Sequence, residues 1–307
     1  MNKSKPLAAF IAFIALVTMV FICLVWPVWR DANHPENSIW LARMAWLVTV
    51  ACLLVFLMAV SVAVTQRPLG FLINERNLMS LTRFQTVLWT VIILSAFFVV
   101  ALDRIISKKE LPLEIAVDKR LWALLGISLT SLVGTSLINS TKTNKTPDEQ
   151  EVQKTAKALA ATGNAPAPAN PQAAVVVDAS ANAKQAADAA LAAQTVSVKN
   201  DMTANKQGTL YANPSMNDAS FSDMFEGDEV GNAAYLDLAK VQMFFFTIIV
   251  GLSYAFVLLS ETLPDLAMAP ETVKALPVLS AGMIALLGIS HAGHLAGKTA
   301  DRTKLAG

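Results

Sequence analysis

The sequence predicts an all-α integral membrane protein with about six transmembrane helices, a duplicated two-helix hairpin and a flexible Ala-rich cytoplasmic segment. Three observations predict this fold class. Of the 307 residues, 54% are hydrophobic and only 15% are charged, whereas globular proteins carry about 25% charged residues. Six apolar windows approach the roughly 20 residues that a helix needs to cross a bilayer. Short phrases of the third and fourth windows recur, in the same order, in the last two.

The six windows define the expected transmembrane helices. The first resembles a signal peptide because Lys3 and Lys5 precede it, but its apolar run is long and no small-residue cleavage site ends it, so we expect an uncleaved helix. The fourth is the shortest and the richest in hydroxyl groups. The windows cover Leu7–Val28, Ala42–Thr65, Phe84–Leu102, Leu121–Ile138, Val241–Leu259 and Leu276–Ala296.

The distribution of charge between the windows predicts that both termini face the cytoplasm, where Lys and Arg accumulate. The loop between the last two windows is acidic, with Glu261 and Asp265 near a single Lys274, and is expected outside. The loop over residues 103–120 is an exception, because it mixes basic and acidic residues. The basic residues assigned to the cytoplasmic side are Lys3, Lys5, Arg67, Arg76, Arg83, Lys298, Arg302 and Lys304.

An internal repeat relates two pairs of windows. The segment Arg83–Ile92 matches Lys240–Ile249 in spacing, and the phrase Ala-Leu-Leu-Gly-Ile-Ser occurs at both 123–128 and 285–290. Both hairpins would enter from the cytoplasmic side, which makes a parallel repeat. The predicted segments are therefore an N-terminal helix pair (1–66), the first repeat copy (67–140), a flexible cytoplasmic linker (141–234) and the second repeat copy (235–307).

The central segment differs from the rest of the chain in composition. The Pro-rich run at 165–171 is typical of an extended spacer, and the Ala-rich stretches at 148–161 and 179–193 contain few large apolar residues. Such a composition buries too little surface to offset the entropy of ordering, so we expect a linker and not a domain.

The end of this segment, Phe221–Asn232, combines aromatic and acidic residues at helical spacing. Our preferred interpretation is a short amphipathic helix at the membrane surface. The alternative is that its acidic residues dock onto the basic second loop, which carries Arg67 and Arg76, or onto the C-terminal tail.

Four motifs carry a resemblance: Ser-Leu-x-Arg-Phe-Gln-x-x-Leu-Trp-Thr from Ser80, Leu-Trp-x-Leu-x-Gly-Ile-Ser from Leu121, Leu-Gly-Ile-Ser-His-Ala-Gly from Leu287, and the stretch Phe225–Asn232. Together they cover about half of the chain, and the sequence resembles a group of bacterial multi-pass inner-membrane proteins that carry no established function. The resemblance implies a bacterial inner (cytoplasmic) membrane and transfers no functional residue.

Polar and small residues inside the windows are candidates for helix packing or for lining a pore. Repeat-equivalent glutamines could bond to each other or line a polar path, and small residues let helices approach closely. These candidates are Gln85, Gln242, Ser128, Ser131, Gly134 and Gly288.

His291, His294 and Lys298 recur at three- and four-residue spacing and share a helix face. A metal site needs more ligands than this face offers, so no metal is expected. We expect cations at a helix C-terminus, with anionic lipid headgroups as the candidate contact.

No constellation of residues predicts an enzyme or a cofactor. The loose phosphate-loop pattern at 292–299 falls at the end of a predicted helix, where the dipole is negative. The windows also lack a central Asp, Glu, Lys or Arg, on which ion-coupled transporters depend.

The sequence therefore predicts a non-enzymatic membrane anchor or scaffold that engages a cytoplasmic protein through its central segment. The first alternative is an oligomeric channel or membrane-permeabilising effector, and the second is a small-molecule transporter. The expected partners are the lipid bilayer, further copies of the chain and a cytoplasmic protein, with no role for nucleic acid at a net charge of +1.

Overall fold

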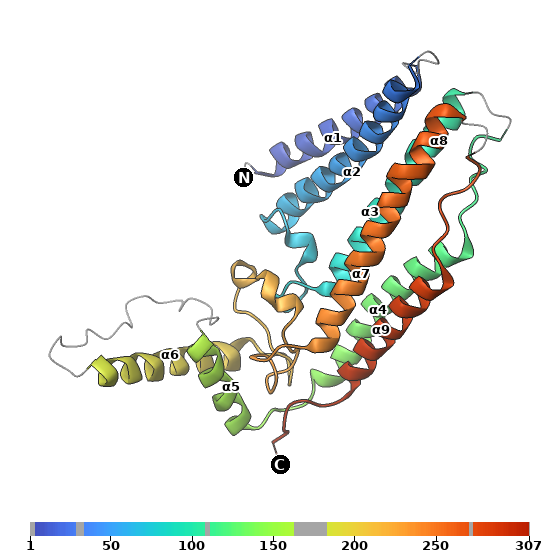
Figure 1. The fold of residues 1–307 in the computed structure, drawn as a ribbon. Helices are drawn as coiled ribbons and strands as arrows, with labels where there is room; N and C mark the ends of the chain where they lie inside the picture. The colour runs from blue at the N-terminus through green and yellow to red at the C-terminus, as the bar shows by residue number, and fades with distance from the viewer. Residues whose placement is uncertain (1–3, 29–33, 108–110, 163–182, 270–272, 307) are drawn as a thin grey trace. The chain divides into compact units, whose positions relative to one another are not determined.

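A computed structural model describes residues 4–28, 34–107, 111–162, 183–269 and 273–306. The regular elements of these residues are helical, and pairings between extended residues are isolated bridges (Figure 1). The α-helices are α1 (Ser4–Val28), α2 (Pro35–Thr65), α3 (Leu81–Ile106), α4 (Lys119–Lys142), α5 (Glu149–Thr162), α6 (Ala183–Asn205), α7 (Leu238–Val257), α8 (Leu263–Met268) and α9 (Ala281–Thr299). Shorter turns are η1 (Gly70–Leu72), η3 (Met216–Asp218), η4 (Phe221–Met224) and the π-helical η5 (Leu258–Thr262).

The contacts divide the chain into two compact units. Unit 1 comprises Met1–Leu72, Thr82–Ser131 and Met243–His291. Unit 2 comprises Ile73–Leu81, Leu132–Gln242 and Ala292–Gly307. Each unit is therefore assembled from segments that are distant in the sequence.

Four helices of the described residues are long and apolar enough to cross a membrane: Glu36–Thr65, Leu81–Ile106, Lys119–Lys142 and Leu238–Met268. They correspond to the second to fifth predicted windows, and the all-α membrane class is confirmed. The described apolar stretch of α1, Pro6–Ile22, is shorter. The second half of α9 carries two histidines and a lysine, which reduce its mean hydropathy.

The centre of unit 1 lies between α3 and α7, which run side by side (Figure 1). Trp89 and Tyr254 are buried in its core. At Gly251 an added Cβ would lie 3.3 Å from the Leu88 side chain, so the glycine permits this close packing. On its other face α7 exposes a stripe of large apolar side chains, as contact with lipid requires: Phe245, Ile249, Leu252 and Phe256.

The transition from α7 to α8 passes through the π-helical turn η5. The Leu263 amide bonds to the Leu258 carbonyl, and residue 264 is a proline with no N–H, so neither amide can serve the Leu259 carbonyl. Arg43 of α2 supplies the missing donor, with its Nε 2.8 Å from the Leu259 oxygen. A side chain of one helix thus compensates for a proline in another.

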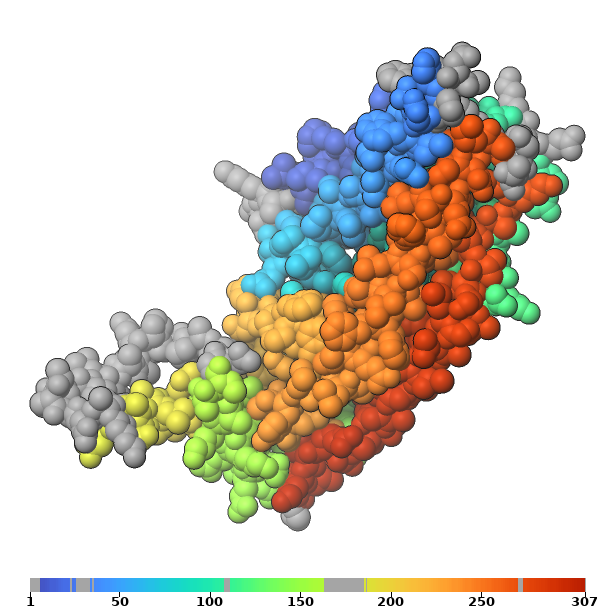
Figure 2. All heavy atoms as spheres, in the orientation of Figure 1, coloured from blue at the N-terminus to red at the C-terminus, as the bar shows by residue number. Residues whose placement is uncertain are grey.

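Unit 2 contains a packed core of its own. Asp148 caps α5 by accepting the Gln150 amide at 2.7 Å, and α5 then packs against α6. The apolar side chains buried in this core include Leu78, Val152, Leu159, Val198, Met202, Tyr211 and Val230. In the space-filling view the chain between α6 and α7 forms a compact mass (Figure 2).

The expectation of a linker without a packed face at 141–234 does not describe these residues. Most of the large apolar residues of α5 and α6 lie on the facing sides, with Val196 as an exposed exception, and Ala156 and Ala160 allow the helices to approach closely. Residues 206–237 then add Tyr211 and Val230 to the same core. The Pro-rich stretch at 165–171 lies outside the described residues.

Two valines of α6 test this packing. Val198 is 2% exposed and Val196 is 59% exposed. Val198→Ala should destabilise the α5–α6 core by about 2 kcal/mol, from lost burial and the cavity left behind. Val196→Ala should change it by less than about 0.5 kcal/mol. Hydrogen-exchange protection of residues 149–162 measures both, and equal effects would show that α6 is not packed.

Candidate functional site

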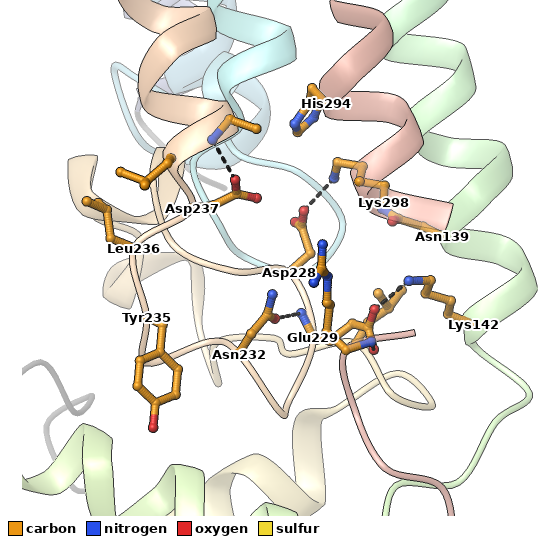
Figure 3. Close-up of a pocket in the computed structure, with 15 residues that line it drawn as sticks. Asn139, Lys142, Asp228, Glu229, Asn232, Tyr235, Leu236, Asp237, His294 and Lys298 are labelled. Carbon is orange, nitrogen blue, oxygen red and sulfur yellow. Dashed lines mark hydrogen bonds and ion pairs between the residues drawn. The ribbon is translucent and has the colours of Figure 1, made fainter. Parts of the chain in front are cut away.

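A cavity of about 380 Å³ in unit 2 brings charged side chains together (Figure 3). Its walls come from the end of α4, from the segment between α6 and α7, from the start of α7 and from the end of α9 with the C-terminal tail. The charged residues in the lining are Lys142, Asp228, Glu229, Asp237, Lys298 and Arg302.

Asp228 is the centre of this cluster. Its Oδ1 lies 2.6 Å from Nη2 of Arg76, and its Oδ2 lies 2.6 Å from Nζ of Lys298 and 3.3 Å from Nζ of Lys240. The Asp228 side chain is only 15% exposed. Arg76 also donates through Nη1 to the backbone carbonyls of Asp228 at 2.8 Å and Tyr211 at 3.0 Å. One carboxylate therefore joins three cations that lie far apart in the sequence.

These contacts change the protonation equilibria of both partners. Burial alone would raise the pKa of Asp228, but Lys240, Lys298 and Arg76 hold it well below its usual range. Lys298 lies beyond the expected span at 276–296, and burial lowers its pKa to about 8, with Asp228 opposing this shift and the two neighbouring cations adding to it. The Asp228 carboxylate therefore stays ionised among three cations, and Lys298 gives up its proton more readily than an exposed lysine does.

Glu229 forms a second buried pair next to the first. Its Oε1 is bonded to the ammonium group of Lys142, which also donates to the Ala300 carbonyl at 2.8 Å. Its Oε2 accepts the backbone amides of Arg302 and Thr303, each at 3.0 Å. Both oxygens of this carboxylate are thus bonded, and the C-terminal tail is joined to the end of α4.

Two glycines explain how the backbone comes so close. At Gly231 an added Cβ would lie 2.5 Å from the Arg302 carbonyl, so a larger residue would push the tail away. Gly208 has a φ of 64°, and an added Cβ there would lie 2.2 Å from the Lys142 carbonyl. Both positions need glycine for the chain to reach the end of α4 and the tail.

The acidic stretch at 221–232 follows the alternative interpretation and not the preferred one. The expected amphipathic helix is wrong, because only Phe221–Met224 forms a short helical turn and the chain beyond it turns repeatedly. Asp228 instead docks onto Arg76 of the second loop and Lys298 at the end of α9. Desolvated carboxylates gain more from three buried cations than the stretch would gain from lying on a surface.

The structure separates the six candidates for packing or pore lining. Gln85 is buried and donates to Thr247 Oγ1 at 2.6 Å, whereas its repeat equivalent Gln242 is exposed. Ser128 and Ser131 are also buried in unit 1. The bonding of Gln85 to α7 fits helix packing, and the expected bond between the two glutamines is replaced by one to Thr247.

The two candidate glycines lie at helix contacts. An added Cβ at Gly134 would lie 3.3 Å from Leu295 within unit 2, and one at Gly288 would lie 3.8 Å from Ile127 within unit 1. Both distances describe packed neighbours between α4 and α9, as small residues allow.

His291, His294 and Lys298 are all buried, so none of them is available to headgroups at an open surface. His291 Nδ1 lies 2.6 Å from Ser131 Oγ in unit 1. His294 and Lys298 line the unit 2 cavity (Figure 3). The headgroup contact expected of these three residues stays a prediction, and the cavity is where His294 and Lys298 could make it.

The sequence analysis did not identify Lys142, Lys240, Asp228 and Glu229 as a site. Arg76 was named only in the alternative docking interpretation and as a topology signal, and Lys298 as a topology signal and a candidate headgroup contact. The signal that could have found the pairs is the group of three acidic residues Glu226, Asp228 and Glu229 beside aromatic residues, but their partners are up to 152 residues away. Among the described residues no group of His, Cys, Asp and Glu could hold a metal ion, and residues 292–299 are helical instead of forming a phosphate loop.

Comparison with protein-family models, curated proteins and solved structures found no match to this chain.

The role of Asp228 is tested by Asp228→Asn, which leaves Arg76, Lys240 and Lys298 without their shared carboxylate. We expect unit 2 to lose about 3–5 kcal/mol of stability, because breaking a buried pair leaves uncompensated charge. The matched control is Asp301→Asn, since Asp301 pairs with Lys145 at an exposed site and should cost about 0–1 kcal/mol. Urea-dependent pulse proteolysis of the 141–234 segment measures both, and equal losses would contradict a special role for Asp228.

A second test is the acid dependence of unit 2. Because the folded pKa of Asp228 is below its ordinary value of 3.8, the unfolded state binds the proton first as the pH falls. The stabilisation is therefore complete above about pH 4 and is lost progressively below it. Hydrogen exchange of residues 225–237, corrected for intrinsic rates, should show this loss in the wild type, and Asp228→Asn should show a flatter profile. Identical profiles would contradict the pKa assignment.

Proposed function

We propose that the chain is a non-enzymatic membrane anchor or scaffold, which holds unit 2 at the membrane so that it can engage a protein partner. The observation that supports this is that Asp228 and Glu229 form buried ion pairs with Arg76 and Lys142. These pairs join the ordered segment between α6 and α7 to the second loop and the end of α4, so the segment is not a flexible linker. The surface offered to the partner is the outward side of α6, which carries Val196.

The proposal includes the finer membrane arrangement. We propose six spans, with α1 and α9 added to the four membrane-length helices, a parallel repeat of two hairpins, and both termini in the cytoplasm of a bacterium with the chain in its inner membrane. The basic residues at helix ends support this orientation, and it assigns residues 73–80 and 143–237, which lie between the spans, to the cytoplasmic side.

The orientation predicts which positions a membrane-impermeant maleimide can reach. In a variant with both native cysteines replaced, Ser222→Cys should be labelled only after the membrane is opened, and Glu261→Cys should be labelled in intact cells. Both positions are exposed in the structure, so burial does not explain a difference. Labelling of Ser222→Cys in intact cells would contradict the orientation.

The scaffold role is tested by a photo-reactive residue at Val196 in cells. We expect a discrete protein adduct whose yield falls at least about fivefold when Asp228→Asn is added, because unit 2 is then strongly destabilised, and stays unchanged with Asp301→Asn. An adduct that is insensitive to Asp228→Asn would mean that α6 acts as an unfolded tether, and adducts with lipid or with this chain alone would count against a protein partner.

A further inference from the structure

The unit 2 cavity is amphiphilic. Its charged interior includes Lys298, whose side chain is only 8% exposed. Its lining also includes three residues with outward side chains: Tyr235 is 52%, Leu236 62% and Leu238 72% exposed. Buried charge next to exposed apolar surface is the combination that a lipid headgroup and its first carbons require.

The backbone holds this apolar rim in place. The Asp237 amide donates to the Phe225 carbonyl at 2.7 Å, and the Gly227 amide donates to the Tyr235 carbonyl at 3.1 Å. Phe225 in turn contacts Phe221 edge to face, with ring centroids 5.3 Å apart. The rim is therefore a fixed surface of the fold and not a flexible loop that happens to expose leucine.

The rim is also continuous with a membrane-length helix. Leu238 is the first residue of α7, and the apolar run Leu238–Met268 is long enough to span a bilayer. A residue at the first turn of such a helix lies at the level of the interface, where Tyr and Leu side chains contact lipid. A lipid in the surrounding bilayer would therefore lie close to this surface.

The buried lysine has bonding capacity to spare. An ammonium group carries three N–H donors, and within the described residues the side-chain bond of Lys298 is the one to Asp228 Oδ2. Arg76 and Lys240 share that carboxylate, so positive charge around Lys298 is only partly compensated. The amide of Asn139 lines the same cavity (Figure 3).

In the part of the chain that the structure describes, the carboxylates that line the cavity leave N–H donors of Lys298 unbonded. Asp228 is bonded to the three cations, and Glu229 to Lys142 and two backbone amides. Asp237 caps α7 by accepting the Ala239 amide at 3.0 Å. Each is committed to a donor other than the spare N–H groups of Lys298.

We propose that this cavity binds the headgroup of a phospholipid, with the phosphate accepting hydrogen bonds from Lys298 and the apolar rim contacting the glycerol and first acyl carbons. The site goes beyond the scaffold role and does not depend on it, since a scaffold could hold unit 2 without binding lipid.

The test uses full-length protein purified in detergent and titrated with short-chain phosphatidylglycerol by native mass spectrometry. Lys298→Gln should weaken binding about tenfold or more, because it removes a charged donor to the phosphate. It should leave unit 2 folded, since Arg76 and Lys240 still pair with Asp228. Lys145→Gln is the matched control at an exposed pair and should leave binding unchanged. Leu236→Ser should weaken lipid binding severalfold, whereas Val196→Ser should not.

Two further arms separate the sources of phosphate. Inorganic phosphate at millimolar concentration should compete poorly, because it gains nothing from the apolar rim. Binding of inorganic phosphate as tight as that of the lipid, or binding of lipid unchanged in Lys298→Gln, would overturn the proposal. Absence of any lipid adduct in the wild type, with hydrogen exchange showing a folded unit 2, would overturn it as well.

Discussion

The fold of unit 2 depends on one constraint. Two neighbouring carboxylates, Asp228 and Glu229, are buried away from water, so they need cations and backbone amides as partners. A buried charge without a partner costs several kcal/mol. The segments that carry the partners must therefore stay next to the two carboxylates. Arg76 precedes Asp228 by 152 residues and Lys298 follows it by 70. The pairings therefore fix the second loop, the acidic segment, the end of α9 and the tail in a single arrangement.

Unit 1 follows a different principle. Its core is a large cluster of apolar side chains, and small residues such as Gly251 let its helices pack closely. Two polar side chains show how polar groups are used there: Gln85 bonds to Thr247 between helices, and Arg43 donates to the Leu259 carbonyl, which Pro264 leaves without a backbone donor. This difference matches the surroundings that each unit is expected to have. Between helices in lipid, close packing is a main source of association. In water, exposed charge pairs contribute little, so the pairs of unit 2 are buried.

The sequence predicted features that depend on local pattern. Apolar windows, helix ends and the membrane class depend on neighbouring residues, and the windows around Trp89 and Val250 agree with the helices found. The core of unit 2 was not predicted because alanines such as Ala156 and Ala160 bury little surface and are typical of a linker. In the structure these small residues let α5 approach α6. The docking of the acidic stretch onto the second loop or the tail was only an alternative interpretation, and Asp228 was not singled out, because the sequence gives no distance between residues 76, 228 and 298. Arg76 and Lys298 were interpreted as topology signals, which basic residues near membrane helices also provide.

The most direct test of the central claim is a double-mutant cycle between Arg76 and Asp228, with the free energy of unfolding of unit 2 as the measured quantity. Arg76→Met and Asp228→Asn are measured alone and together, so that the bonds of Arg76 to backbone carbonyls cancel from the coupling term. The account predicts that the two losses are not additive, with a coupling energy of about 1–3 kcal/mol. Additive losses, within about 0.5 kcal/mol, would mean that the pair does not hold unit 2 together and would contradict the account.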